Sequence, residues 1–137
     1  WIIEKHFGYC SEKVFSFATI EENVLAVRAN KWGGCCVKWW YHVTPLIRVK
    51  VPAGSRSFIL AYVIDPGMFN EPVLLSTWLN AQKNKTCNLY ATVDSYSIQP
   101  SSAYTPSNYE TGEFNTDPDY SQTNATLTSY ATYVTCN

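Results

Sequence analysis

The segment VKWWYHVTPLIRVKVPAGSRSFILAYVIDPG, residues 37–67, carries the pattern that decides the fold. Apolar side chains recur at every second position, which is typical of strands with one buried face. Val37, Trp39, Tyr41 and Val43 alternate with Lys38, Trp40, His42 and Thr44, and Ile47, Val49 and Val51 alternate with Arg48 and Lys50. Residues 52–54 then predict a turn, residues 56–64 a central strand, and residues 65–67 its abrupt end.

The same alternation returns in the rest of the chain. Residues 14–20 and 23–29 flank Glu21-Glu22 and predict a hairpin, and residues 87–96 and 127–136 predict further strands. Helical spacing is confined to a turn or two within residues 71–80. About seven to nine strands at this spacing predict an all-β fold, an antiparallel two-sheet sandwich of jelly-roll-like or immunoglobulin-like type.

A chain of 137 residues fits one domain, and we expect residues 1–137 to form a single β-sandwich domain. Residues 99–126 interrupt the alternation with a long segment rich in Ser, Thr, Tyr and Pro. A segment of that length within one domain predicts a long irregular loop.

Cysteines and sequons indicate an extracellular location. The chain begins at Trp1 and contains one Met, which suggests a processed chain or an excised fragment. Five cysteines favour an oxidising compartment, and the sequons at Asn84 and Asn124 predict two glycosylation sites. No apolar run approaches the roughly 20 residues that span a bilayer. We therefore expect a secreted or cell-surface glycoprotein.

The five cysteines cannot all pair within one chain. Neighbouring residues of a strand point to opposite faces, so Cys35 is expected to point inward and Cys36 outward. The pairing that we favour joins Cys10 to Cys35 and Cys87 to Cys136, which leaves Cys36 for an intermolecular bridge or a free thiol. The alternatives are a vicinal disulfide between Cys35 and Cys36, and exchanged roles if a bulge at Gly33-Gly34 shifts the register.

Charge is distributed unevenly along the chain. The net charge of −1 argues against a nucleic-acid partner. Residues 1–60 carry eight basic against four acidic side chains, whereas residues 61–137 carry two basic against seven acidic ones. A basic N-terminal half and an acidic C-terminal half predict head-to-tail attraction between copies of the chain. The simpler alternative is that this uneven distribution of charge arose by chance.

No catalytic motif stands out in the sequence. The two histidines, His6 and His42, lie next to no nucleophile elbow or cysteine signature. Asp65, Glu71 and Asp94 are carboxylates that a glycosidase could use, but nothing in the sequence brings any two together. Cys35-Cys36 with His42 is no recognisable zinc spacing. The sequence thus predicts neither an enzyme nor a metal or other cofactor.

Exposed aromatic side chains are the remaining lead. Alternation places Trp40 on one face with Lys38 and His42, and a second row contains Tyr90, Asp94 and Tyr96. Aromatic faces flanked by polar groups suit a partner protein or a sugar ring. These features predict a structural or adhesive extracellular subunit that associates with copies of itself. The alternative is a carbohydrate-binding, lectin-like module that uses the same aromatic residues.

Overall fold

A computed structural model describes residues 2–5, 7–18 and 22–101, together with residues 121, 124, 125, 128, 134 and 135. Its regular secondary structure consists mostly of antiparallel strands, with little helix. The larger sheet has five strands in the order β6-β5-β4-β1-β7, and a smaller sheet has the order β2-β3-β8. The all-β prediction is therefore confirmed in these terms.

The strands and helices have the following bounds along the chain. The helices are α1 (Ile2–Lys5), a short 3-10 turn η1 (Asn30–Trp32) and α2 (Leu75–Ala81). The five-stranded sheet contains β1 (Ser11–Phe17), β4 (Tyr41–Ala53), β5 (Arg56–Val63), β6 (Val73–Leu74) and β7 (Ser95–Pro100). The smaller sheet contains β2 (Leu25–Ala29), β3 (Cys35–Trp39) and β8 (Val134–Thr135).

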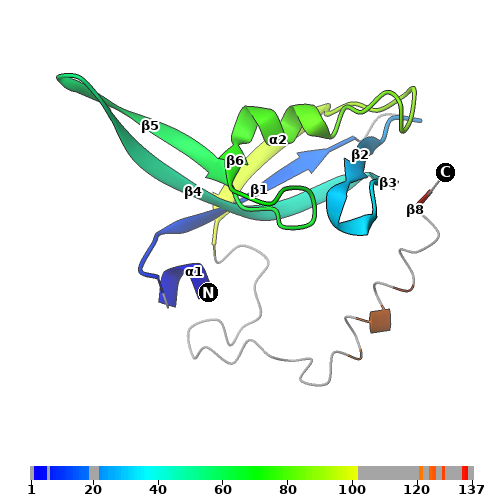
Figure 1. Ribbon diagram of the computed structural model, residues 1–137, viewed down its shortest axis with the longest axis horizontal. Helices are drawn as coiled ribbons and strands as arrows, with labels where there is room; N and C mark the ends of the chain where they lie inside the picture. The colour runs from blue at the N-terminus through cyan, green and yellow to red at the C-terminus, as the bar shows by residue number, and fades with distance from the viewer. Residues whose placement is uncertain are drawn as a thin grey trace.

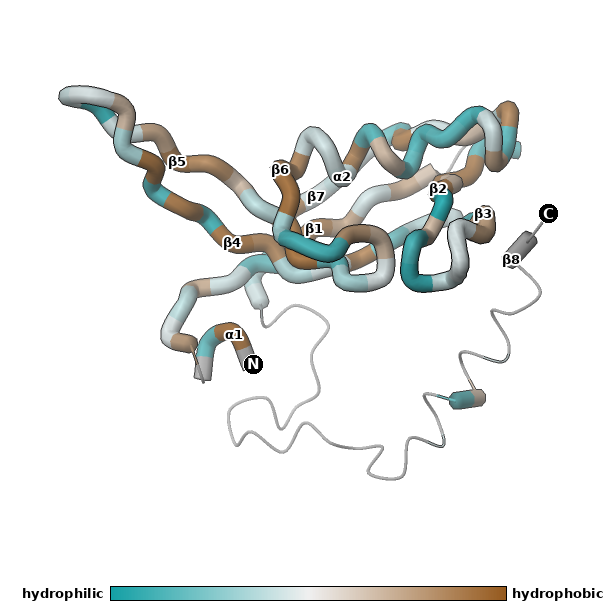
Figure 2. Tube along the Cα trace, viewed as in Figure 1, coloured by the Kyte–Doolittle hydropathy of each residue, from teal (hydrophilic) through white to brown (hydrophobic). Residues whose placement is uncertain are grey.

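A long hairpin forms the centre of the molecule, as the pattern in residues 37–67 predicts. β4 and β5 pair antiparallel from Leu46 opposite Val63 to Ala53 opposite Arg56, around a turn at Gly54. Gly54 has a φ of 62°, a left-handed conformation that glycine adopts without a steric penalty. Figure 2 shows that apolar and polar residues interchange along β4, whereas β5 is largely apolar, and the tip of the hairpin projects from the body (Figure 1).

One face of the large sheet is covered by α2, not by a second sheet (Figure 1). The buried core joins residues of both sheets to this helix: Val14, Val27, Ala29, Val37, Leu46, Val63, Met68 and Trp78. The smaller sheet lies beside the C-terminal end of α2, since Ala26 N donates to Gln82 O at 2.8 Å and Asn84 N donates to Ala26 O at 3.1 Å. The arrangement is β-rich, and the helix takes the place that a facing sheet has in a sandwich.

Three strand predictions need correction. The hairpin expected across Glu21-Glu22 is wrong, because β1 pairs with β4 and β7 while β2 pairs with β3. The strand expected over residues 87–96 begins only at Ser95, since residues 84–94 form turns and irregular backbone with one isolated bridge at Ala91. β7 also extends to Pro100, inside the expected loop, whereas residues 102–120 of that loop lie outside the described residues.

The cysteine assignment also differs from the expected one. Cys36 is bonded to Cys87 of the same chain, and Cys35 is disulfide-bonded as well, so neither is an outward free thiol. Cys10 is exposed and free, so its expected bridge to Cys35 is wrong. Cys136 lies outside the described residues. Alternation does not predict this bridge because Cys87 lies on a loop beside β2 and β3, where its sulfur lies 3.4 Å from Val27 O.

The expected glycosylation sites lie at the surface. Asn84 is half-buried, and its side-chain oxygen accepts bonds from Thr86 N at 3.0 Å and Cys87 N at 3.3 Å. Asn124 is exposed within a helical stretch. Glycosylation at both asparagines stays a prediction. The described part of the chain includes no helix long and apolar enough to cross a membrane.

Removal of the Cys36–Cys87 bridge should destabilise the domain strongly. The two cysteines are 51 positions apart, and closing a loop of that length is worth about 4 kcal/mol in the chain-entropy account. We expect the C36A/C87A double variant to lose most of that amount in the free energy of unfolding, measured by urea titration. Cys10→Ala is the matched control and should leave the midpoint unchanged. An unaltered midpoint in the double variant would contradict this role of the bridge.

Candidate active site

The open end of the β4–β5 hairpin brings a histidine and an aspartate together. His42 is the second residue of β4, and Asp65 follows β5 by two positions. Thr44 Oγ1 donates to Ile64 O at 2.6 Å, and Ile64 N donates to Pro45 O at 3.0 Å. The two arms of the hairpin therefore stay paired beyond the end of β5. As a result His42 Nε2 lies 2.7 Å from Asp65 Oδ2.

The Asp65 carboxylate is 7% exposed and has four hydrogen-bond donors around it. Its Oδ2 accepts from His42 Nε2 at 2.7 Å and from Trp78 Nε1 at 2.8 Å. Its Oδ1 accepts from the backbone N–H of Gly67 at 3.1 Å and of Met68 at 3.2 Å. A buried charge is tolerated when its lone pairs are satisfied in this way.

Opposing influences act on the pKa of Asp65. Burial is the largest and raises the pKa, because it disfavours the charged form. The hydrogen bond and the charge of His42, followed by the bonds from Trp78 and Met68, lower the pKa by more in total. The pKa of Asp65 therefore lies below its ordinary value, and the group is an anion at neutral pH.

The imidazole of His42 is held on both its edge and its faces. It stacks on Trp39 with ring centroids 4.8 Å apart, and on Trp78 with centroids 5.6 Å apart. An ionised carboxylate only accepts hydrogen bonds, so in neutral His42 the proton resides on Nε2 and the lone pair on Nδ1. The side chain is 21% exposed, which leaves solvent a path to the ring. A histidine oriented by a buried aspartate is the arrangement of a general base.

A family model described as "Glutaminase" matches residues 3–82, which include both His42 and Asp65. The chain belongs to this glutaminase family. No curated protein matches the chain at a significant level. The family match overturns the expected structural or adhesive subunit, the lectin-like alternative and the expectation that the chain is no enzyme.

Solved structures agree with membership of the glutaminase family. The protein-glutaminase of Chryseobacterium proteolyticum, solved by NMR, is 33% identical over 69% of this chain, with a TM-score of 0.55. A crystal structure of protein-glutaminase is 32% identical over 72%, and one of pro-protein-glutaminase is 34% identical over 69%, with TM-scores of 0.55 and 0.54. This chain spans 45%, 47% and 30% of those three chains, respectively.

The structure separates His42 from the residues expected beside it. A bend at Trp40 divides β3 from β4, so strict alternation does not continue through it, and His42 faces α2. Lys38 is half-buried on β3, and Trp40 is 62% exposed. Tyr90, Asp94 and Tyr96 are exposed, but a loop replaces the single strand that was to align them.

Trp40 lines a groove on the face of the sheet opposite to His42. The groove has a volume of about 480 Å³, and its walls are Lys13, Phe15, Phe17, Trp40, Tyr41, Val43, Ser97 and Gln99. These strand residues alternate with the buried Val14, Ser16 and Thr44, so they face away from α2. Among the described residues, no three His, Cys, Asp or Glu side chains gather as a metal site would require.

The hairpin itself contained the signal that sequence reasoning missed. Strands that pair around Gly54 place Thr44 opposite Asp65 when the register of Ala53 and Arg56 is continued. His42 then lies two positions from Thr44 on the same face, since side chains alternate. Taken one at a time, His42 resembles part of a contact surface and Asp65 an unpartnered carboxylate, so only the register of the hairpin brings them together.

The depressed pKa of Asp65 predicts how stability depends on acidity. In the unfolded chain an aspartate has a pKa of about 3.9. A carboxyl whose folded pKa lies lower stabilises the fold fully above that value, and the contribution is lost as pH falls through the folded pKa. We expect the free energy of unfolding to drop below about pH 4, and Asp65→Asn to remove part of this drop.

The exposed carboxylate of Asp94 gives the control for this measurement. Urea titrations from pH 6 to pH 2 should show the same acid dependence in D94N as in the parent protein. If the free energy of unfolding falls equally at low pH in D65N and in the parent protein, Asp65 does not have a depressed pKa.

Proposed function

We propose that this chain is part of an enzyme that hydrolyses the side-chain amide of glutamine within proteins, and that His42 and Asp65 form its general-base pair. The observation that carries the proposal is the 2.7 Å contact between His42 Nε2 and the buried Asp65 carboxylate. Both residues lie in the segment that matches the glutaminase family. The reaction converts the amide and one water into a carboxylic acid and ammonia.

The geometry assigns a role to each nitrogen of His42. Nε2 donates to Asp65, which keeps the ring in one tautomer, and Nδ1 accepts the proton of the attacking nucleophile. The imidazolium that forms is stabilised by the Asp65 anion, and it then gives its proton to the departing nitrogen. Ammonia leaves, and the acyl carbon ends as a carboxylate.

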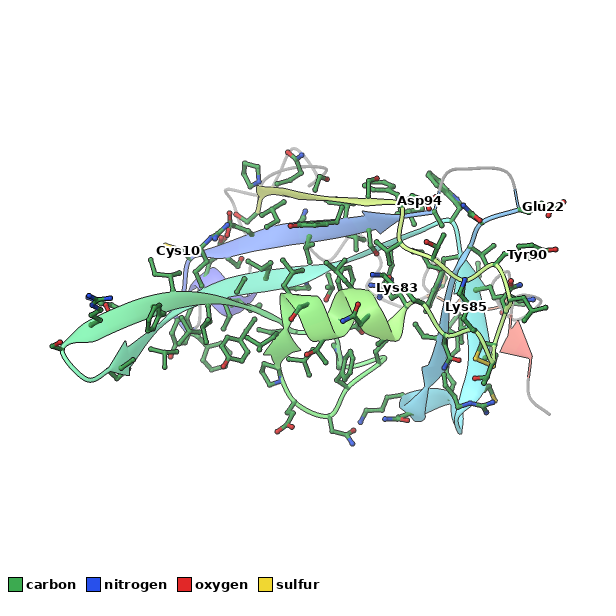
Figure 3. All side chains as sticks on the ribbon, turned by 90° about the horizontal axis from the view of Figure 1, so that it is seen from above. Cys10, Glu22, Lys83, Lys85, Tyr90 and Asp94 are labelled. Carbon is green, nitrogen blue, oxygen red and sulfur yellow. A yellow bond between two sulfur atoms is a disulfide. The ribbon has the colours of Figure 1, made fainter. Side chains whose placement is uncertain are left out.

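The nucleophile comes from outside the described residues, or is water. In the described part of the chain, no hydroxyl or thiol forms a hydrogen bond with His42. Cys10 is a free thiol, but it precedes Ser11, which pairs with Ile47, whereas His42 pairs with Ser16. Five strand positions correspond to roughly 16 Å, beyond the reach of a hydrogen bond. Figure 3 shows Cys10 at the start of β1 and Asp94 near the other end of that strand.

Protein-bound glutamine is the substrate that the relatives favour. The matched structures are named protein-glutaminases, and they share 32–34% of their residues with this chain over about 70% of its length. Since this chain spans less than half of each of them, the remaining part of the active site is proposed to come from further sequence.

An extracellular location is part of the same proposal. The Cys36–Cys87 disulfide fits an oxidising compartment. A relative exists as a pro-protein, a form that is common for enzymes activated after synthesis. Secretion of this protein would place the enzyme where it meets intact protein substrates.

Substitution of His42 should slow amide hydrolysis strongly. A general base contributes about 10²–10⁴-fold to the rate, so we expect H42A to lose that factor in kcat/KM. His6→Gln is the matched control, because His6 is the other histidine of the chain. The measurement is ammonia release from a glutamine-containing substrate protein. The enzyme and its variants are used in the form in which the source produces the enzyme.

Product analysis by mass spectrometry separates the substrate classes. We expect amide-to-acid conversion at glutamine in intact proteins, and little conversion of free glutamine or of asparagine. Hydrolysis of free glutamine alone would contradict the substrate assignment. Activity equal to the parent in H42A would contradict the assignment of the base.

A further inference from the structure

Ser16 and Gln82 form a fully buried polar pair behind the proposed base. Both side chains are 0% exposed. Ser16 Oγ donates to Gln82 Oε1 at 2.7 Å, and Gln82 Nε2 donates to the backbone oxygen of Trp78 at 3.2 Å. Buried amides and hydroxyls are costly unless they are hydrogen-bonded, so a pair of this kind needs a reason.

The position of this pair supplies the reason. Ser16 lies directly opposite His42 in the pairing of β1 with β4. Gln82 follows the last residue of α2 and binds the carbonyl of Trp78 one helical turn earlier. Trp78 contacts both members of the proposed base, since its Nε1 donates to Asp65 and its ring stacks on His42.

These contacts close a circuit of hydrogen bonds between the sheet and the helix. Ser16, which pairs with His42 across the strands, bonds to Gln82, and Gln82 bonds to the backbone of Trp78. The indole of Trp78 bonds to Asp65, and Asp65 accepts from His42, which completes the network. The backbone oxygen of Gln82 also accepts from Ala26 N at 2.8 Å, which ties the same residue to β2. The end of α2 is thus bound to two sheets at once.

We propose that Gln82 is a positioning residue, which sets the rotation of α2 against the sheet and so fixes where the Trp78 indole meets Asp65 and His42. The inference rests on the proposed function for its kinetic consequence. Hydrogen bonds are directional, whereas apolar packing tolerates small rotations and shifts. An apolar side chain of similar size would fill the space of Gln82 without defining the orientation of Trp78.

The decisive variant is the double substitution S16A/Q82M. It removes the hydroxyl and the amide together, so no buried polar side chain loses its partner, and stability is largely retained. Asn80→Ala is the matched control, because it removes the bond from Lys83 Nζ to Asn80 Oδ1 at the same end of α2 but on the solvent side.

Two readouts report on position and not on stability. The first is the proton NMR spectrum, in which the His42 Nε2–H and Trp78 Nε1–H signals depend on their bonds to Asp65; His6→Gln assigns the histidine signal. The second is the kinetics of amide hydrolysis by the protein as its source produces it. Misplaced catalytic groups lower kcat, so we expect S16A/Q82M to lose at least about tenfold in kcat with KM within about twofold.

The outcomes are distinct. A folded double variant with shifted or broadened N–H signals and a reduced kcat supports the proposal, provided that N80A matches the parent. A folded double variant with parental signals and parental kcat overturns it. If the parent protein hydrolyses no glutamine amide, the proposed function fails, and the two N–H signals alone decide whether Gln82 positions the pair. Should the double variant not fold, S16A cuts the link to the strand by itself, and the same readouts decide.

Discussion

The buried carboxylate of Asp65 is the constraint on which the rest of this structure depends. An anion that is 7% exposed requires donors on all sides, and three parts of the chain supply the four donors: the start of β4, the turn after β5, and α2 with its Trp78. Gly67 leaves room for the carboxylate at that turn, because a Cβ there would lie 3.3 Å from Asp65 Oδ1, a tight contact that would press on the side chain. The helix therefore covers this face of the sheet where its indole N–H reaches the carboxylate.

The sequence predicts local structure well where alternation and turn residues agree. The β4–β5 hairpin, the turn at Gly54 and the end of β5 shortly before Asp65 follow from residues 37–67, and α2 overlaps the expected residues 71–80 up to Asn80. The pairing of β1 with β4 instead of β2 could not be predicted, because both strands alternate equally well. Ser16 of β1 is buried and bonded to Gln82, 66 positions further along the chain, and nothing in an isolated strand pattern reveals that partnership.

The candidate site was harder to predict than the fold for a related reason. His42 lies among exposed-looking polar residues, and a bend at Trp40 reverses the face that strict alternation assigns to it. Cys36 was assigned by the same alternation, whereas its partner Cys87 lies on a loop. For His42 the strand rule fails because the chain leaves the strand at Trp40, whereas Cys36 lies inside β3 and alternation alone cannot indicate a partner on a loop. Membership of the glutaminase family then gives the His42–Asp65 contact a chemical meaning that neither residue has alone.

The central claim is that His42 and Asp65 act as one unit in amide hydrolysis. A double-mutant cycle in kcat/KM, with H42A, D65N and H42A/D65N measured on a glutamine-containing protein, tests it most directly. If Asp65 works by orienting His42, D65N lowers the rate in the parent but adds nothing once His42 is removed, so H42A and the double variant are equally slow. Losses that multiply in the double variant would contradict the account, because they would mean that the two residues act independently.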